Sequence, residues 1–193
     1  METLRELDQQ LFLLLNGFHT PVLDYFMMFI SQTIAWIPLY AYLLYLIVRE
    51  HKKESWIILI CIAITIVLTD RITSGLMKPY FLRLRPSHEP ALQHLVHLVK
   101  QRNGEFYKGG LYGFASSHAA NTFGIATFFF LLLRPTHRWI GLLFAWAILV
   151  TYSRIYLGVH YPGDVLAGAL VGAICAWIVF RLYRFYKYRS HHP

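Results

Sequence analysis

The stretch "WIGLLFAWAILVTYSRIYLGVHYPGDVLAGALVGAICAWIVF", residues 139–180, contains two long apolar runs separated by a short polar segment. With its flanking residues, each run approaches the roughly 20 mainly apolar residues that a membrane-spanning helix needs. The polar segment, residues 153–164, contains Ser153, Arg154, His160 and Asp164. Because ionisable side chains beside a bilayer are unfavourable, their presence predicts a functional site at this end of the two helices.

The composition of the chain is that of a membrane protein. Of its 193 residues, 56% are hydrophobic and 17% are aromatic, and the mean hydropathy is +0.44. The net charge is +8. Because the basic residues do not form a soluble domain, anionic lipid headgroups or phosphate substrates are the expected partners, and no nucleic acid is expected. Cys61 and Cys175 lie within apolar runs, so they are expected to be buried thiols rather than a disulfide.

The N-terminal segment is predicted to be an amphipathic helix that lies at the membrane interface. Its leucines recur at helical spacing among charged and amide residues, and the pattern ends at Asn16-Gly17. These leucines are Leu4, Leu7, Leu11 and Leu14. The first ten residues, "METLRELDQQ", lack a basic region leading into an apolar core, so no signal peptide is expected.

The rest of the chain predicts an all-α, polytopic membrane helix bundle. About five segments have membrane length, at residues 22–48, 55–77, 117–134, 138–155 and 164–184. No internal repeat or low-complexity linker separates them. We therefore expect a single membrane-embedded domain over residues 1–193, with one long loop at about residues 79–116.

The basic residues give the expected orientation of the bundle in the membrane. Nine of them alternate onto one side, namely Arg49, Lys52, Lys53, Arg134, Arg138, Arg181, Arg184, Lys187 and Arg189. Nine lie elsewhere, namely Arg5, Arg71, Lys78, Arg83, Arg85, Lys100, Arg102, Lys108 and Arg154. The positive-inside rule favours the first side as cytoplasmic if several of the second group are held in a site. This predicts a cytoplasmic C-terminus in a cell (inner) membrane, with the 79–116 loop and the 153–164 segment facing the periplasm or outside.

Three polar clusters then fall on the same side of the membrane. They are "KPYFLRLRP" at 78–86, "ASSHAANTF" at 115–123, and the 153–164 segment. Together they supply several cations, two imidazoles, hydroxyls at a helix start and one carboxylate. This set suits phosphoryl transfer, which needs positive charge around the phosphate, an in-line nucleophile and an acid for the leaving oxygen.

Each of these residues taken alone has a simpler structural explanation. A single Lys or Arg at the end of a membrane helix usually extends to the interface. A Ser-Ser pair before a helix is often a plain N-cap, and one loop histidine is usually structural. Independent structural roles do not explain two histidines and a carboxylate on the side that also carries the cations.

The three clusters resemble the signatures of the type-2 phosphatidic acid phosphatase superfamily, in the correct order. Residues 78–86 match K-x6-R-P, residues 116–118 occupy the place of P-S-G-H, and residues 153–164 match S-R-x5-H-x3-D. In the second signature Ala115 and Ser117 replace the family's Pro and Gly. The added Cβ of Ser117 is expected to shift the bound phosphate slightly.

The resemblance implies a role for each matching residue and requires no metal or other cofactor. His160 would attack phosphorus and form a phosphohistidine, oriented by Asp164, and His118 would protonate the leaving group. Five residues would bind the substrate phosphate, namely Lys78, Arg85, Arg154, Ser116 and Ser117. Arg83 lies outside the strict signature and is an extra phosphate contact or a headgroup contact.

Three features outside the signatures carry weaker predictions. Asp70 and Arg71 are interpreted as paired charges that orient Lys78 or link helices rather than as catalytic groups. His94 and His97 have a spacing that could suit a metal, but the apolar residues around them favour an interfacial amphipathic helix. The segment "RNGEFYKGG", residues 102–110, carries turn signals and predicts a hairpin or a flexible cap over the site.

The resulting hypothesis is a membrane enzyme that hydrolyses a lipid phosphate or diphosphate. The preferred substrate is undecaprenyl diphosphate, because Arg83 would be a spare cation for a second phosphate. The alternatives are a phosphatidylglycerophosphate or lipid A phosphatase and a lipid phosphotransferase. A soluble haloperoxidase with the same motifs is disfavoured by the membrane segments, and a transporter or silent binding protein by the full set of catalytic positions. The oligomeric state stays open.

Overall fold

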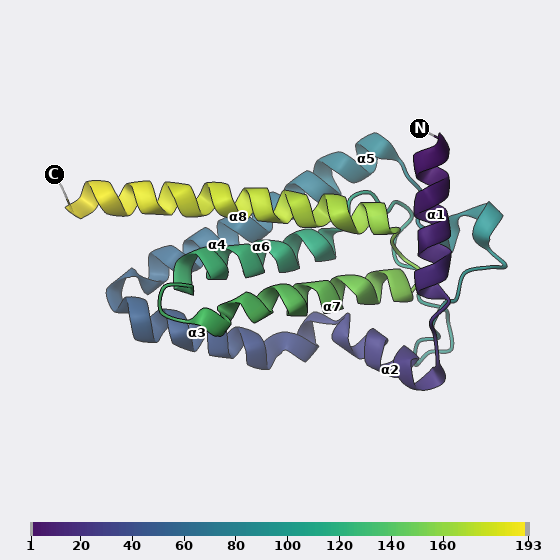
Figure 1. Ribbon diagram of the computed structural model, residues 1–193, viewed down its shortest axis with the longest axis horizontal. Helices are drawn as coiled ribbons and strands as arrows, with labels where there is room; N and C mark the ends of the chain where they lie inside the picture. Colours follow the sequence, from purple (N-terminus) through teal and green to yellow (C-terminus); the bar gives the residue numbers. More distant parts are fainter. Residues whose placement is uncertain (1, 192–193) are drawn as a thin grey trace.

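The computed structural model describes residues 2–191, and within this range every named element is a helix. Five helices run along the long axis of the molecule (Figure 1): α3 (Ile37–His51), α4 (Ser55–Asp70), α6 (Ser117–Leu133), α7 (Leu142–Tyr156) and α8 (Pro162–His191). A π-helical turn, η3 (Arg71–Met77), and the short α5 (Lys78–Phe81) continue α4. The predicted all-α membrane bundle is confirmed.

The first predicted segment, residues 22–48, is wrong as a single helix. The structure divides it into α2 (Pro21–Ile30), the 3₁₀ turn η1 (Thr33–Trp36) and α3. Pro38 lies in the first turn of α3, and a proline disfavours helical backbone in the residue before it and removes a helix donor. The chain reverses after α3 at Lys52, whose φ is 42°, so α3 and α4 form a hairpin (Figure 1).

Three helical stretches of the described chain are long and apolar enough to cross a membrane: Thr33–Phe81, Arg138–Tyr156 and Pro162–Arg189. The first is the hairpin of α3 and α4 with its continuation. The described chain would hold a fourth if α1 (Glu2–Asn16) and α2, which meet at 114°, formed one broken span. α6 is a shorter apolar helix of 17 residues. Apart from the divided first segment, these helices coincide with the five predicted segments.

The α1 helix crosses one end of the bundle almost at right angles to the other helices (Figure 1). It ends at Asn16 as predicted. Its two faces differ: Leu4 and Leu14 are 73% and 60% exposed, whereas Phe12 is fully buried against the bundle. An exposed leucine face beside a buried inner face suits a helix that lies between lipid and protein.

Small residues allow α6 and α8 to pack closely. A Cβ at Gly172 would overlap the backbone oxygen of Ala120, and a Cβ at Gly168 would overlap that of Ser116. Small residues at a membrane helix interface bring two backbones together. Both helices begin at the same end of the bundle, where the Ser116 N–H donates to the Asp164 backbone oxygen at 2.9 Å. This packing brings the second and third polar clusters into contact.

The long connection between α5 and α6 contains one confirmed prediction and one error. A hairpin forms around residues 99–107, with a bridge between Lys100 and Phe106. The predicted amphipathic helix around His94 and His97 is absent, since helical structure here stops with the 3₁₀ turn Pro90–Leu92. The Asn16 side chain donates to the His97 backbone oxygen and accepts from the His97 N–H, and these hydrogen bonds hold the segment against α1 instead.

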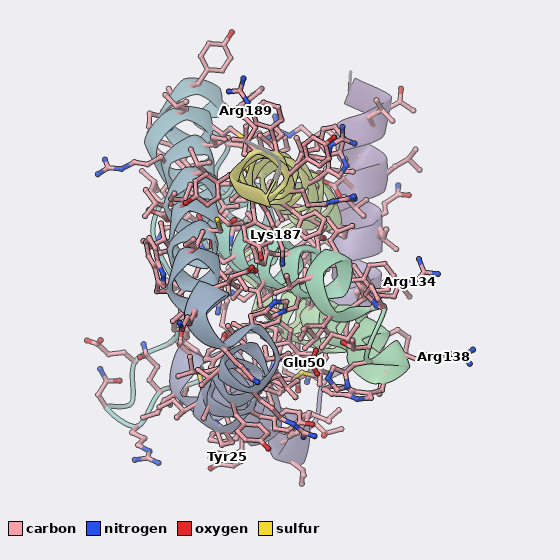
Figure 2. All side chains as sticks on the ribbon, turned by 90° about the vertical axis from the view of Figure 1, so that its left-hand side faces the viewer. Tyr25, Glu50, Arg134, Arg138, Lys187 and Arg189 are labelled. Carbon is pink, nitrogen blue, oxygen red and sulfur yellow. The ribbon has the colours of Figure 1, made fainter. Side chains whose placement is uncertain are left out.

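The opposite end of the bundle carries the basic connections. Figure 2 shows this end, with Arg134, Arg138, Lys187 and Arg189 around it. Glu50 pairs there with His137, and Glu54 pairs with Lys187 at 2.7 Å. Cys61 and Cys175 are buried free thiols. The polar clusters and this basic group therefore occupy opposite ends of the molecule.

Candidate active site

The three polar clusters meet at the end of the bundle that α1 crosses. Five of the predicted residues lie at helix ends: Lys78 begins α5, Arg154 lies in the last turn of α7, Asp164 in the first turn of α8, and Ser117 and His118 begin α6. Arg85 and His160 lie in the segments that follow α5 and α7. Helices that end together thus gather residues that are up to 86 positions apart in the chain.

His160 is at the centre of the site and is only 1% exposed. Its Nδ1 lies 3.4 Å from Asp164 Oδ2, and its Nε2 lies 3.3 Å from Arg85 Nη1. The same Oδ2 accepts a hydrogen bond from the Tyr161 N–H at 3.0 Å, which holds the carboxylate in place. The imidazole therefore has one nitrogen beside a carboxylate and the other beside the guanidinium of Arg85.

The surroundings of His160 favour its neutral form. Burial lowers the pKa of the imidazole well below its usual range, and the charges of Arg85 and Arg154 lower this pKa further. The charge of Lys78 acts in the same direction, while a hydrogen bond with the Gly113 backbone opposes it. A neutral imidazole keeps the free electron pair that a nucleophile needs.

The two arginines of the signatures are held by other parts of the chain. The guanidinium of Arg85 donates to the backbone oxygens of Tyr112 at 3.1 Å and Val159 at 3.3 Å. Arg154 is 3% exposed, and it donates to the hydroxyls of Ser31 and Tyr107. Its Nε–H is buried without a hydrogen-bond partner among the described residues. Such a donor is unfavourable unless a ligand satisfies it.

Lys78 is positioned by hydrogen bonds to the preceding turn of its own helix and to the start of α6. Its Nζ donates to Ser117 Oγ at 2.8 Å and to Ser74 Oγ at 3.2 Å. Ser74 donates to Asp70 at 3.1 Å. The interpretation that Asp70 helps to orient Lys78 agrees with these contacts. The π-helical turn places these residues, and such turns are frequent at functional sites.

The two serines of the second signature have different partners. The Ser116 hydroxyl accepts from the Ala119 N–H at 3.4 Å and is fully buried, so it forms the N-cap of α6. The Ser117 hydroxyl contacts Lys78, Thr73 and Ser74. The first backbone N–H groups and the positive end of the α6 dipole also lie at this end, which is a favourable place for an anion.

Arg83 is not the spare cation that the sequence argument assumed. Its guanidinium contacts Asp164 Oδ1 at 2.9 Å and Asp8 Oδ2 at 2.7 Å, and it lies 4.1 Å from the centre of the Tyr161 ring. Two carboxylates therefore already neutralise it. The structure therefore does not support Arg83 as an extra contact for a phosphate or a headgroup.

Three further residues that no signature contains contact the site. Gly113 lies where a Cβ would be 2.8 Å from Asp164 Oδ2 and 3.3 Å from Arg85 Cγ. Tyr107, at the end of the hairpin, bonds to Arg154, and Asp8 on α1 bonds to Arg83. Tyr107 lies in the predicted cap, where the pattern signals only a turn, and Gly113 lies three residues after the end of that segment. Asp8 lies among the charged residues between the leucines of the predicted amphipathic helix, and that pattern gives no sign of a contact with the site.

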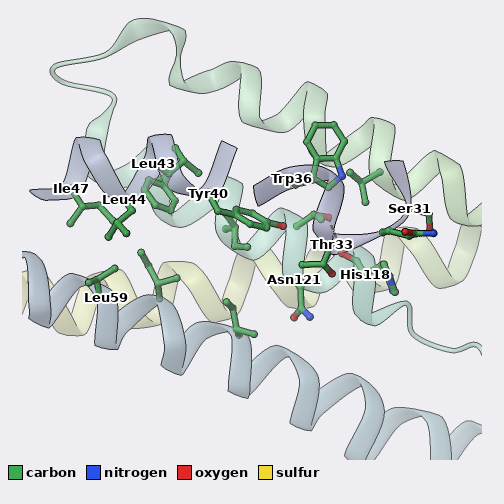
Figure 3. A pocket seen from close by; sticks show the side chains of 17 residues that line it. Ser31, Thr33, Trp36, Tyr40, Leu43, Leu44, Ile47, Leu59, His118 and Asn121 are labelled. Carbon is green, nitrogen blue, oxygen red and sulfur yellow. Dashed lines mark hydrogen bonds between the residues drawn. The ribbon is translucent and has the colours of Figure 1, made fainter. Parts of the chain in front are cut away.

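An apolar groove leads away from His118 between α3, α4 and α6. Its volume is about 400 Å³, within the usual range for small-molecule sites. Figure 3 shows its polar end at Ser31, His118 and Asn121 and its apolar end at Leu44 and Leu59. These two leucines are 44% and 40% exposed, so the groove reaches the apolar surface of the bundle.

Within residues 2–191, no three His, Cys, Asp or Glu side chains are grouped to hold a metal ion. The site has instead the charges of Lys78, Arg85 and Arg154 around a buried imidazole. This arrangement can bind a phosphate group and offer it a nitrogen nucleophile.

Comparison with known proteins finds lipid phosphatases among the relatives of this chain. A lipid A 4′-phosphatase from Bacteroides thetaiotaomicron is 39% identical over 183 residues, covering 93% of this chain and 78% of that protein. An undecaprenyl-diphosphatase from Sulfolobus acidocaldarius is 31% identical over 175 residues, covering 89% of this chain and 74% of that protein.

A solved structure and a family model also match the chain. The crystal structure of Aquifex aeolicus LpxE superposes with a TM-score of 0.66 and 30% identity, covering 91% of this chain and 95% of that chain. The sequence also matches the family model described as the PAP2 superfamily over residues 54–188, which include all three signatures. The chain therefore belongs to the PAP2 superfamily.

Proposed function

We propose that this membrane lipid phosphatase hydrolyses a phosphate monoester on a lipid of the lipid A type, through a phosphohistidine on His160. The observation that carries the proposal is the placement of His160. Its imidazole is buried and favoured in the neutral form, with a carboxylate at Nδ1 and a guanidinium at Nε2. The groove beside His118 supports a lipid as the leaving group.

In the first step, Nε2 of His160 attacks phosphorus and the P–O bond to the lipid breaks. Lys78, Arg85 and Arg154 stabilise the charge on the phosphoryl oxygens, and the unpartnered Nε–H of Arg154 gains an acceptor. Asp164 stabilises the positive charge that develops on the His160 ring. His118 gives its proton to the leaving lipid oxygen.

In the second step, water attacks the phosphohistidine. His118, now neutral, accepts a proton from this water, the P–N bond breaks and inorganic phosphate leaves. The same imidazole therefore acts first as acid and then as base. Ser116 supports the phosphate site by capping the start of α6. Ser117 supports it by accepting a hydrogen bond from Lys78.

Two observations favour a lipid A type monophosphate over undecaprenyl diphosphate. Arg83 is paired with Asp8 and Asp164, so it is not free for a second phosphate. The 39% identical relative is named a lipid A 4′-phosphatase. Undecaprenyl diphosphate stays the second candidate, because the 31% identical relative is named an undecaprenyl-diphosphatase.

The deciding experiment measures phosphate release by the purified protein in vesicles that contain lipid A, undecaprenyl diphosphate or phosphatidylglycerophosphate. We expect the highest kcat/KM with lipid A and an acid-labile phosphate on His160 after rapid quenching. His160→Gln should lose both signals while keeping its melting temperature. Turnover by folded His160→Gln would refute the phosphohistidine, and a higher kcat/KM with undecaprenyl diphosphate would reverse the substrate assignment.

We also propose that the site faces the periplasm and that the C-terminus is cytoplasmic. The basic side chains labelled in Figure 2 gather at the end of the bundle opposite the site, and cytoplasmic connections of membrane proteins are enriched in such residues.

A further inference from the structure

We infer that Asp8 of α1 is a positioning residue for the catalytic pair His160 and Asp164. This inference rests on the proposed phosphohistidine chemistry. Asp8 lies 156 positions before Asp164 in the chain, yet its carboxylate reaches the segment that carries His160.

The carboxylate of Asp8 has two partly buried partners. Oδ2 lies 2.7 Å from Arg83 Nη2, and Oδ1 accepts a hydrogen bond from the Gly163 N–H at 2.7 Å. Gly163 permits this approach, because a Cβ there would lie 2.7 Å from Asp8 Oδ2. The side chain of Asp8 is 15% exposed, so water screens these contacts only partly.

Arg83 transmits the position of Asp8 to the catalytic carboxylate. The other nitrogen of its guanidinium is 2.9 Å from Asp164 Oδ1, while Asp164 Oδ2 faces His160 Nδ1. Asp8, Arg83, Asp164 and His160 therefore form one continuous chain of polar contacts. Because the guanidinium is planar and contacts two carboxylates, a shift of either carboxylate changes the orientation of the other.

Two other residues of α1 hold the same catalytic segment from the same helix face. Phe12 packs edge to face on Tyr161, with ring centres 5.4 Å apart. Asn16 donates to the Tyr156 backbone oxygen at 2.8 Å. Since Asp8, Phe12 and Asn16 are four residues apart in turn, one stripe of α1 contacts the chain from Tyr156 to Gly163. Of these three residues, Asp8 is the one that is linked to the Asp164 carboxylate, through the charged side chain of Arg83.

The test compares Asp8→Asn with Arg5→Gln. Asparagine keeps the shape and the acceptor for Gly163 but removes the charge that holds Arg83. Arg5→Gln removes a second ion pair of α1, a contact with Glu89 at 3.3 Å in which Arg5 is 63% exposed. We expect Asp8→Asn to lower both kcat and the rate of phosphohistidine formation by about 10- to 100-fold, with little change in KM. Arg5→Gln should leave both rates unchanged.

The effects of Asp8 and Arg83 should not add, because both act through Asp164. We expect the Asp8→Asn/Arg83→Gln double variant to be no slower than Arg83→Gln alone. If Asp8→Asn does not fold, Asp8→Glu replaces it. This variant keeps the charge but moves the carboxylate by one methylene group, and it should also lower kcat with little change in KM.

A wild-type rate of phosphohistidine formation in folded Asp8→Asn, or a loss confined to melting temperature, would overturn the positioning role. An additive double variant would do the same. Failure of the wild-type protein to form the adduct would instead refute the proposed function, so the two failures are distinguishable.

Discussion

At the scale of single residues, the site depends on side chains that the signatures contain and on others that they omit. Ionisable groups beside a membrane are energetically unfavourable and usually functional. The sequence therefore makes five site residues recognisable, namely Lys78, Arg85, Arg154, His118 and His160. Gly113 gives no such signal. Its importance arises from a close approach that appears only when the long loop folds against α8.

Gly113→Ala should impair catalysis more than stability. The new Cβ would lie 2.8 Å from Asp164 Oδ2 and would displace the carboxylate that orients His160. We expect kcat to fall by about 10²-fold, because misplacement by about 1 Å can have this effect. Gly110→Ala is the matched control in the same loop, since a Cβ there meets nothing within 4 Å. Equal activity of the two variants would contradict this account.

His160 should remain neutral at pH values at which an ordinary histidine is charged. Its folded-state pKa is lowered by burial and by Arg85, Arg154 and Lys78, whereas an unfolded histidine has a pKa of about 6.5. Folding therefore disfavours the protonated ring, and the contribution of His160 to stability decreases as the pH falls below the unfolded value. In ¹⁵N-labelled protein, the His160 ring resonances, assigned with His160→Gln, should show the neutral ring at pH 6. A titration midpoint near that of a free histidine would be inconsistent with the described environment.

At the scale of elements, hydrophobic patterning located the helices but not their interruptions. Residues 55–77, 117–134, 138–155 and 164–184 became helices because long apolar runs must satisfy their backbone polar groups internally. The 22–48 segment was divided by Pro38 and by the polar residues before it. The segment around His97 had a helical pattern, but hydrogen bonds to Asn16 and a contact between His97 and Asp24 at 2.8 Å fixed it in another conformation. Such long-range partners are not visible in local spacing.

The interface of α6 and α8 should tolerate almost no added volume. In Gly172→Ala the Cβ would overlap the Ala120 backbone oxygen, so the helices must separate where they carry the second and third clusters. We expect a loss of about 1–3 kcal/mol in the free energy of unfolding, as for other overpacked sites. Thermal melting in detergent compares this variant with Gly75→Ala, at which a Cβ meets nothing within 4 Å. Equal melting temperatures would show that the interface can relax.

At the scale of the whole molecule, the gathering of the three signatures could be predicted, because successive membrane segments return the chain to the same side of the bilayer. The substrate was harder to infer. The argument for a diphosphate depended on a free Arg83, and only the folded structure shows that α1 supplies a carboxylate to it. A helix that was interpreted only as a membrane-surface element thus changed the functional inference.

The orientation of the molecule gives a prediction at the same scale. Asn103→Cys, at the tip of the hairpin, should react with a membrane-impermeant thiol reagent from outside intact cells. Arg138→Cys, at the opposite end, should react only after the membrane is opened. The two natural cysteines are buried, so they should contribute little background. The reverse labelling pattern would place the site in the cytoplasm.

If the groove beside His118 holds the lipid chains of the substrate, as proposed, the substrate concentration that matters is the concentration within the membrane. Since the apolar end of the groove reaches the bundle surface at Leu44 and Leu59, a substrate can arrive by lateral diffusion with its chains still in the bilayer. Its affinity is then described by a mole fraction of membrane lipid rather than by a molar concentration. Adding inert phospholipid to the vesicles should slow the reaction at constant total substrate, whereas diluting the same vesicles with buffer should leave the rate per enzyme unchanged.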